Sequence, residues 1–107
     1  MQRIAFTIRV KPEKLEAYRK LHNSIWPELI EELKAAGLRN YSLWLQPDGT
    51  EFGYLECDDW QASCAYLAES EVHDRWQQLM QEYLLTPVSD EEGGQPIEML
   101  ERVFLLQ

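Results

Sequence analysis

The chain has 107 residues, 45% of them hydrophobic and 27% charged, which is typical of one globular domain with a single core. Its formal net charge of -9, from 19 acidic and 10 basic residues, repels phosphate backbones and anionic lipids and disfavours nucleic acid and membrane partners. Because no apolar run could cross a bilayer and the N-terminus lacks a secretion signal, we expect one cytoplasmic domain, residues 1–107, with a neutral small-molecule ligand.

The N-terminal third is predicted to form a strand and one long helix. Residues 3–10 alternate between apolar and other side chains, as in a strand with one apolar face. Pro12 suits the first turn of a helix and Gly37 a left-handed stop, so the helix is expected to span residues 12–36. Pro27 lies inside this helix, where the missing N–H donor is expected to bend it.

Three further strands and one loop are predicted. Residues 40–46 and 51–57 have the composition of strands and are joined by QPDGT, a hairpin signal. Residues 86–96 are rich in acidic residues, glycine and proline, and are predicted to form a loop. Residues 97–106 are predicted to form the last strand.

Two shorter helices are predicted between the hairpin and the loop. Asp58 or Asp59 can cap a helix that begins near Trp60. Ser70 can cap a second helix that continues to Tyr83. The second helical stretch of the chain is therefore expected to be divided in two.

The predicted order of elements is βαββαβ. This order is that of the ferredoxin-like fold, an α+β fold in which helices pack on one face of a four-stranded antiparallel sheet. The last predicted strand, residues 97–106, carries apolar side chains on both of its faces. Because helices can cover only one face, we predict that the other is buried against a second copy of the chain, in a homodimer.

Tyr18 and His22 form the first candidate for chemistry. They are four residues apart on the predicted helix, so their side chains are neighbours on one face. His22 precedes the bend expected at Pro27, where irregular packing leaves room for a cavity. A histidine there suits proton transfer near neutral pH. The alternative is a half-buried structural histidine bonded to a neighbouring tyrosine.

Two aromatic residues are expected to converge on the same histidine. Tyr41 opens the second predicted strand and Trp76 lies on the last helix, so both border the space between sheet and helices. Pyranose rings have apolar C–H faces that stack on indole or phenol, and hydroxyls that need hydrogen-bonding groups. These residues indicate a sugar site. The other tryptophans are interpreted as packing residues: Trp26, Trp44 and Trp60.

Other kinds of site have little support. Two histidines without HxxxH or HExxH spacing do not indicate a metal centre, and His73 is interpreted as a solvated helix residue. No nucleophile motif or glycine-rich phosphate loop is present. The acidic run at residues 90–92 is interpreted as a solvated loop that could close over a pocket. We therefore expect neither a metal nor a cofactor.

The segment around His22 carries a specific motif. Residues 18–29 read YRKLHNSIWPEL and contain the pattern YxxxHNxIWPE, followed by Asn-Tyr at 40–41 and Arg-Trp at 75–76. Together these residues resemble the L-rhamnose mutarotase family, and the similarity extends over nearly the whole chain. The resemblance implies a dimeric α/β barrel and a cofactor-free enzyme that interconverts the α and β anomers of L-rhamnose or a closely related pyranose.

By the same resemblance, His22 would be the proton donor, and three residues would bind the sugar: Tyr18, Tyr41 and Trp76. One position departs from the family pattern, in which a second tryptophan follows the first, because this chain has Gln77 there. Gln77 is therefore expected to bind substrate and to alter the sugar preference. The same fold also hosts cofactor-free monooxygenases and small-ligand-binding modules, which are the alternative functions.

Overall fold

The computed structural model describes residues 1–107, apart from the side chain of Asp90. Its strands are β1 (Gln2–Arg9), β2 (Arg39–Leu45), β3 (Thr50–Cys57) and β4 (Glu98–Met99). Its α-helices are α1 (Leu15–His22), α2 (Pro27–Ala35), α3 (Trp60–Ala68) and α4 (Glu71–Met80), and two short 3₁₀ helices are η1 (Pro12–Lys14) and η2 (Asp90–Glu92). None of the helices in this described part is long and apolar enough to span a membrane.

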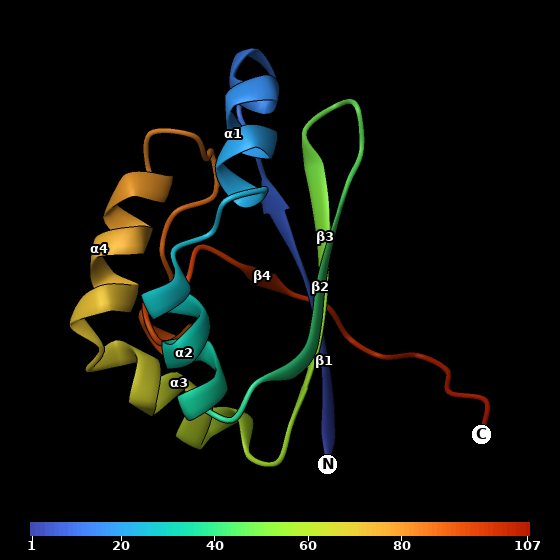
Figure 1. Ribbon diagram of the computed structural model, residues 1–107. Helices are drawn as coiled ribbons and strands as arrows, with labels where there is room; N and C mark the ends of the chain where they lie inside the picture. Colours follow the sequence, from blue (N-terminus) through green and yellow to red (C-terminus); the bar gives the residue numbers. More distant parts are fainter.

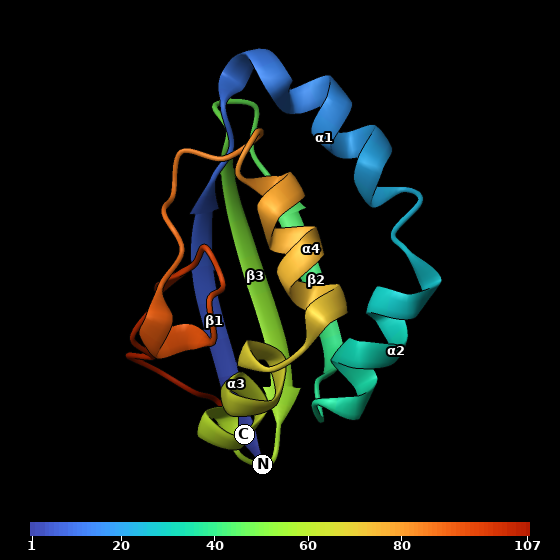
Figure 2. The same cartoon turned by 90° about the vertical axis from the view of Figure 1, so that its left-hand side faces the viewer.

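The four strands form one antiparallel sheet in the order β2-β3-β1-β4. All four α-helices lie on one face of this sheet, and no helix covers the opposite face (Figure 1, Figure 2). The predicted α+β arrangement is confirmed. Between the helices and the sheet lies the hydrophobic core, in which Phe6 of β1 and Leu55 of β3 are fully buried.

The expected single bent helix over residues 12–36 is not observed. The segment forms η1, then α1 and α2, and residues 23–26 between α1 and α2 are not helical. Pro27 is the first residue of α2, and Trp26 before it has an extended ψ of 126°, because a proline ring disfavours helical backbone at the preceding residue. His22 is therefore the last residue of α1, beside a complete break.

The two later helices begin as predicted. Asp59 caps α3, since its Oδ1 accepts a hydrogen bond from the Ala62 amide at 3.2 Å. Ser70 caps α4, since its Oγ accepts from the His73 amide at 3.1 Å. The predicted end of α4 at Tyr83 is wrong by one turn, because the helix ends at Met80 and a turn follows.

The predicted strand over residues 97–106 is largely absent. Strand β4 contains only Glu98 and Met99, and one further backbone bond joins the Leu100 amide to the Ala5 carbonyl at 2.9 Å. Beyond this point, residues 101–107 are exposed and run away from the sheet on the side opposite the helices (Figure 1). In the single chain the apolar side chains of this tail, such as Val103 and Phe104, are therefore exposed.

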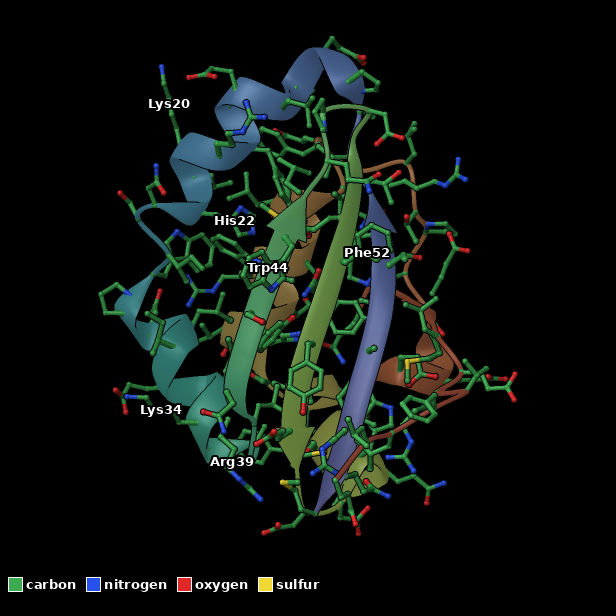
Figure 3. The ribbon with its side chains drawn as sticks, turned by 90° about the vertical axis from the view of Figure 1, so that its right-hand side faces the viewer. Lys20, His22, Lys34, Arg39, Trp44 and Phe52 are labelled. Carbon is green, nitrogen blue, oxygen red and sulfur yellow. The ribbon has the colours of Figure 1, made fainter. Side chains whose placement is uncertain are left out.

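The helix-free face of the sheet carries exposed aromatic side chains. Trp44 of β2 and Phe52 of β3 are paired in register and lie side by side on this face (Figure 3). Trp44 is 68% exposed, so its interpretation as a packing residue is wrong for the single chain. Trp26 and Trp60 do pack against the core, as predicted.

Candidate active site

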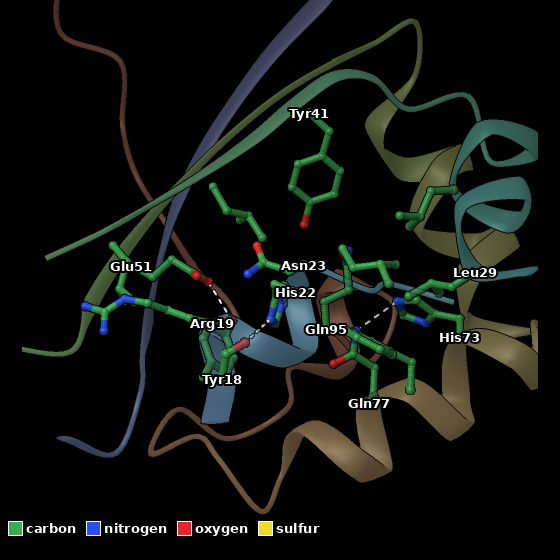
Figure 4. Close-up of a pocket in the computed structure, with 15 residues that line it drawn as sticks. Tyr18, Arg19, His22, Asn23, Leu29, Tyr41, Glu51, His73, Gln77 and Gln95 are labelled. Atoms are coloured by element: carbon green, nitrogen blue, oxygen red, sulfur yellow. Dashed lines mark hydrogen bonds between the residues drawn. The ribbon is translucent and has the colours of Figure 1, made fainter. Parts of the chain in front are cut away.

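A pocket of about 470 Å³ opens between the helix-covered face of the sheet and helices α1, α2 and α4. Its volume suits a single small ligand such as a monosaccharide. The structure brings all five predicted site residues to its walls: Tyr18, His22, Tyr41, Trp76 and Gln77 (Figure 4). Where the wall passes from α1 to α2, the pocket is lined by the non-helical residues Asn23 and Ile25.

The imidazole of His22 is held by its own helix. Its Nδ1–H donates to the Tyr18 carbonyl oxygen at 3.0 Å, which directs Nε2 away from the helix backbone. Burial lowers the pKa of His22 below its ordinary value of 6.5, and the hydrogen bond to the Tyr18 carbonyl opposes this shift. Near neutral pH the ring is therefore mostly uncharged, with a lone pair on Nε2 that can accept a proton.

Aromatic rings fix the orientation of His22. The Tyr18 ring lies 4.1 Å from the imidazole between centroids, and the Trp76 ring meets it edge-on at 5.6 Å. Trp26, from the segment between α1 and α2, packs edge-on against Trp76 at 5.1 Å. The break in the helix thus lets Trp26 brace the aromatic group that surrounds the histidine.

Tyr18 also contacts an acidic residue of the sheet. Its hydroxyl donates to Glu51 Oε1 at 2.8 Å, and both side chains are buried. Burial raises the pKa of Glu51 to about 7, although the hydrogen bond from Tyr18 opposes this shift. Burial, and then the nearby Glu51 charge, also raise the pKa of Tyr18, which keeps the phenol protonated.

Glu51 is not among the residues predicted from the sequence. Along β3, the residues Glu51, Gly53, Leu55 and Cys57 are buried and alternate with more exposed ones. The apolar residues of this series mark the inner face of the strand. That alternation is the signal from which a buried carboxyl could have been predicted.

Tyr41 reaches the pocket from the edge strand β2. A register irregularity interrupts the pairing of β2 with β3 between Arg39 and Ser42, and Asn40 has a positive φ of 49°. Irregularities of this kind redirect side chains, and here the Tyr41 ring lies edge-on to Phe6 at 6.1 Å. Burial raises the pKa of Tyr41, so its hydroxyl remains neutral.

Comparison with known proteins identifies the family. The sequence pattern of the L-rhamnose mutarotase family matches residues 3–106. The chain belongs to this family. It is 35% identical over 108 residues to the L-rhamnose mutarotase of Burkholderia orbicola, with 100% of both chains covered, and 36% identical over 107 residues to that of Pectobacterium carotovorum, with 99% of each covered.

A solved structure agrees with this family assignment. The crystal structure of an L-rhamnose mutarotase from Formosa agariphila matches 100% of both chains with a TM-score of 0.80 and 25% sequence identity. The match includes the sheet and the helices that form the pocket. The fold of this chain is thus that of an L-rhamnose mutarotase.

Gln77, at the position where the resemblance implies a second tryptophan, lines the pocket. Its Nε2 donates to His73 Nε2 at 3.1 Å. Its Oε1 is buried and has no hydrogen-bond partner among the described residues. A buried acceptor without a partner is costly, and a hydroxyl of a bound ligand could supply the missing donor.

His73 was predicted to be solvated, and this prediction is wrong. It is 3% exposed and lines the pocket, where burial lowers its pKa. The error is explained by helix periodicity: His73, Trp76, Gln77 and Met80 lie on one face of α4, and that face meets the core. The spacing from Trp76 is the signal that could have placed His73 inside.

The loop over residues 86–96 contributes one wall of the pocket. Gln95 is buried and lines the cavity. Glu92 accepts a hydrogen bond from the Trp60 indole N–H at 2.8 Å, which ties the loop to α3. The interpretation of the acidic run as a solvated loop is wrong for Glu92, because its carboxylate is hydrogen-bonded to Trp60 of α3.

Proposed function

We propose that this chain interconverts the α and β anomers of L-rhamnose, or of a closely related pyranose, without a cofactor. The observation that carries the proposal is His22, whose Nδ1–H is held by the Tyr18 carbonyl while the ring borders a monosaccharide-sized pocket. Membership of the L-rhamnose mutarotase family supports the same reaction. The neutral sugar also suits a chain with a net charge of -9.

The reaction needs two proton transfers at one end of the sugar. One proton reaches the ring oxygen and one leaves the anomeric hydroxyl, while the bond from C1 to the ring oxygen breaks and the C1 aldehyde forms. The C1–C2 bond then rotates, and the ring closes on the other face of C1 by the reverse transfers. His22 exchanges one of these protons through Nε2, as an acid when protonated and as a base when neutral.

The remaining predicted residues position the sugar. The hydroxyls of Tyr18 and Tyr41 stay protonated and orient sugar hydroxyls by hydrogen bonds. The indole of Trp76 offers an apolar surface to the C–H face of the ring. Positioning and acid–base catalysis are sufficient, since ring opening of a free sugar is already fairly fast.

Saturation-transfer NMR on the anomeric protons tests this proposal. The protein, without added metal or nucleotide, is expected to increase the exchange rate of L-rhamnose well above the rate in buffer. A panel of related pyranoses measured in parallel identifies the preferred sugar. Exchange at the buffer rate for every sugar would refute a mutarotase function and favour a binding module, which would hold sugar without increasing exchange.

Gln77 is expected to set the sugar preference. L-mannose has a hydroxymethyl group where L-rhamnose has a methyl group, and Gln77 Oε1 can accept a hydrogen bond from the additional hydroxyl. Gln77→Trp replaces this acceptor with an apolar ring, so the ratio of kcat/KM for L-rhamnose over L-mannose should rise by about 10-fold or more. Exchange rates for both sugars in both proteins provide the measurement.

Gln78→Trp is the matched control, because Gln78 is the exposed neighbour on the same helix. This control should leave the ratio of kcat/KM for L-rhamnose over L-mannose unchanged. If Gln77→Trp also leaves that ratio unchanged, Gln77 carries no specificity.

The proposed assembly is a homodimer formed through the helix-free face of the sheet. This face carries Trp44 and Phe52, and the tail carries Val103 and Phe104, which are 88% and 76% exposed. Several exposed apolar side chains on one side of a domain indicate a protein partner. A second copy fits because each chain offers both the open sheet face and the tail that leaves beside it (Figure 1).

Light scattering at micromolar concentration should report twice the chain mass of 12.6 kDa. The double variant Val103→Asp, Phe104→Asp should shift the protein toward the monomer, because two charges cannot be buried in an apolar contact without a partner. Gln107→Asp, which adds a charge to the exposed end of the same tail, is the control and should remain dimeric. A monomeric wild-type protein would rule out this assembly.

A further inference from the structure

Glu51 places a carboxyl group in the wall of the pocket, and the neighbours of Glu51 in the sheet are apolar. Its side chain points from β3 toward α1 (Figure 4), and it is 3% exposed. Its register partners on the two flanking strands are Ile8 and Leu45. Within the described part of the chain, its side chain accepts a hydrogen bond from Tyr18 and forms no ion pair.

No cation compensates this carboxyl group. The titratable or charged groups that line the same pocket are Tyr18, Arg19 and His22 from α1, Tyr41 from β2 and His73 from α4. Arg19 is the only permanent cation among them, and its side chain is half-exposed and directed to Glu16, at 3.7 Å. Burying an unpaired carboxylate costs free energy, so the packing of the sheet gives no reason for an acid here.

The position of Glu51 relative to His22 gives a chemical reason. One tyrosine links them: the Tyr18 ring packs on the imidazole at 4.1 Å, and its hydroxyl bonds to Glu51 at 2.8 Å. Both groups line the same cavity, with the imidazole against the Tyr18 ring and the carboxyl group at the Tyr18 hydroxyl. Mutarotation requires proton exchange at two oxygens of one sugar, and His22 accounts for one.

We propose that Glu51 is the second catalytic acid–base group of this pocket, and that it exchanges a proton with one of the two reacting sugar oxygens while His22 exchanges a proton with the other. This assignment rests on the proposed mutarotase function. In ring opening, protonated Glu51 donates to the ring oxygen, and His22 Nε2 accepts the proton of the anomeric hydroxyl. The C1–O bond of the ring breaks and the C1=O double bond forms. Ring closure returns both protons, so the enzyme is unchanged.

The assignment predicts a bell-shaped dependence of exchange on pH. Above a pH of about 7 the Glu51 carboxyl loses the proton that it must donate. At low pH the Nε2 of His22 is already protonated and cannot accept another, and this limb lies below 6.5 because burial lowers the pKa of His22. Exchange should therefore be fastest between the two limbs.

Glu51→Gln tests the assignment, because the amide oxygen still accepts a hydrogen bond from Tyr18 but the group cannot release a proton to the sugar. The exchange rate at saturating sugar should fall by about 100-fold, and the limb near pH 7 should disappear. The Kd of L-rhamnose from calorimetry should change by no more than about threefold. Glu51→Asp retains a titratable acid and should keep part of the rate together with an alkaline limb.

Glu56→Gln is the matched control, since Glu56 lies on the same strand but bonds to Asn40 and Tyr54 away from the pocket. It should exchange at the wild-type rate. Exchange by Glu51→Gln within threefold of wild type, with the alkaline limb intact, would overturn the assignment while leaving the proposed function in place. A wild-type protein that does not increase exchange at all would overturn both.

Discussion

Replacing His22 with alanine is expected to slow anomer exchange by about 100-fold or more, with little change in sugar affinity. The substitution removes the Nε2 that exchanges a proton with the sugar, whereas the groups proposed to bind its hydroxyls remain. Exchange measured by saturation-transfer NMR gives the rate, and calorimetry with L-rhamnose gives the Kd. A lower rate at an unchanged Kd separates proton transfer from binding.

Lys20→Ala is the control for this variant, because Lys20 is exposed on the same helix. It should retain the wild-type rate. His73 is unsuitable as a control, since it is buried in the pocket wall and bonded to Gln77. If the His22 variant retains the wild-type rate, His22 has the alternative, structural role.

The second large effect concerns stability, and Glu51→Gln is expected to increase it at alkaline pH. Burial raises the pKa of Glu51 from its ordinary value of 4.5 to about 7. Between these values the folded state binds more protons than the unfolded state, so the wild-type protein loses stability as the pH rises from about 4.5 to 7. Glutamine does not titrate and avoids this loss, which amounts to about 3 kcal/mol.

Urea unfolding at pH 5 and at pH 8.5 gives the free energy of unfolding of Glu51→Gln and of the wild-type protein. The effect is the change, between the two pH values, in the difference between these two free energies. Relative to wild type, Glu51→Gln should be more stable at pH 8.5 than at pH 5. Glu56→Gln should show no such gain, because hydrogen bonds from Asn40 and Tyr54 hold the pKa of Glu56 below its ordinary value. An equal difference at both pH values would mean that Glu51 titrates normally.

Much of the fold follows from local patterns in the sequence. The alternation around Phe6 gave a strand whose apolar side is buried in the structure. Asp59 and Ser70 mark the starts of α3 and α4 because their side chains replace a missing acceptor for the first helical amides. The YxxxHNxIWPE motif led to the family, and with it to five residues that line one pocket.

The errors arise where a local pattern has two structural solutions. Pro27 can bend a helix or begin one, and in the structure it begins α2 after an extended Trp26 whose ring packs against Trp76. Residues 100–106 have the composition of a strand, but in the structure the chain leaves the edge of β1 after the bond from the Leu100 amide to the Ala5 carbonyl. The alternation of β3 places Glu51 on the inner face, but an acidic residue beside a hairpin turn is usually solvated, and its partner Tyr18 comes from the distant helix α1.

Residues from both halves of the chain line the pocket. His22 and Glu51, the groups proposed to exchange protons, come from the first half, whereas α4 brings His73 and Gln77 from the second half. One turn of α4 can thus be altered without replacing the residues proposed for acid–base chemistry. A library of variants restricted to positions 73 and 77 should therefore yield enzymes for new sugars that keep the same chemistry.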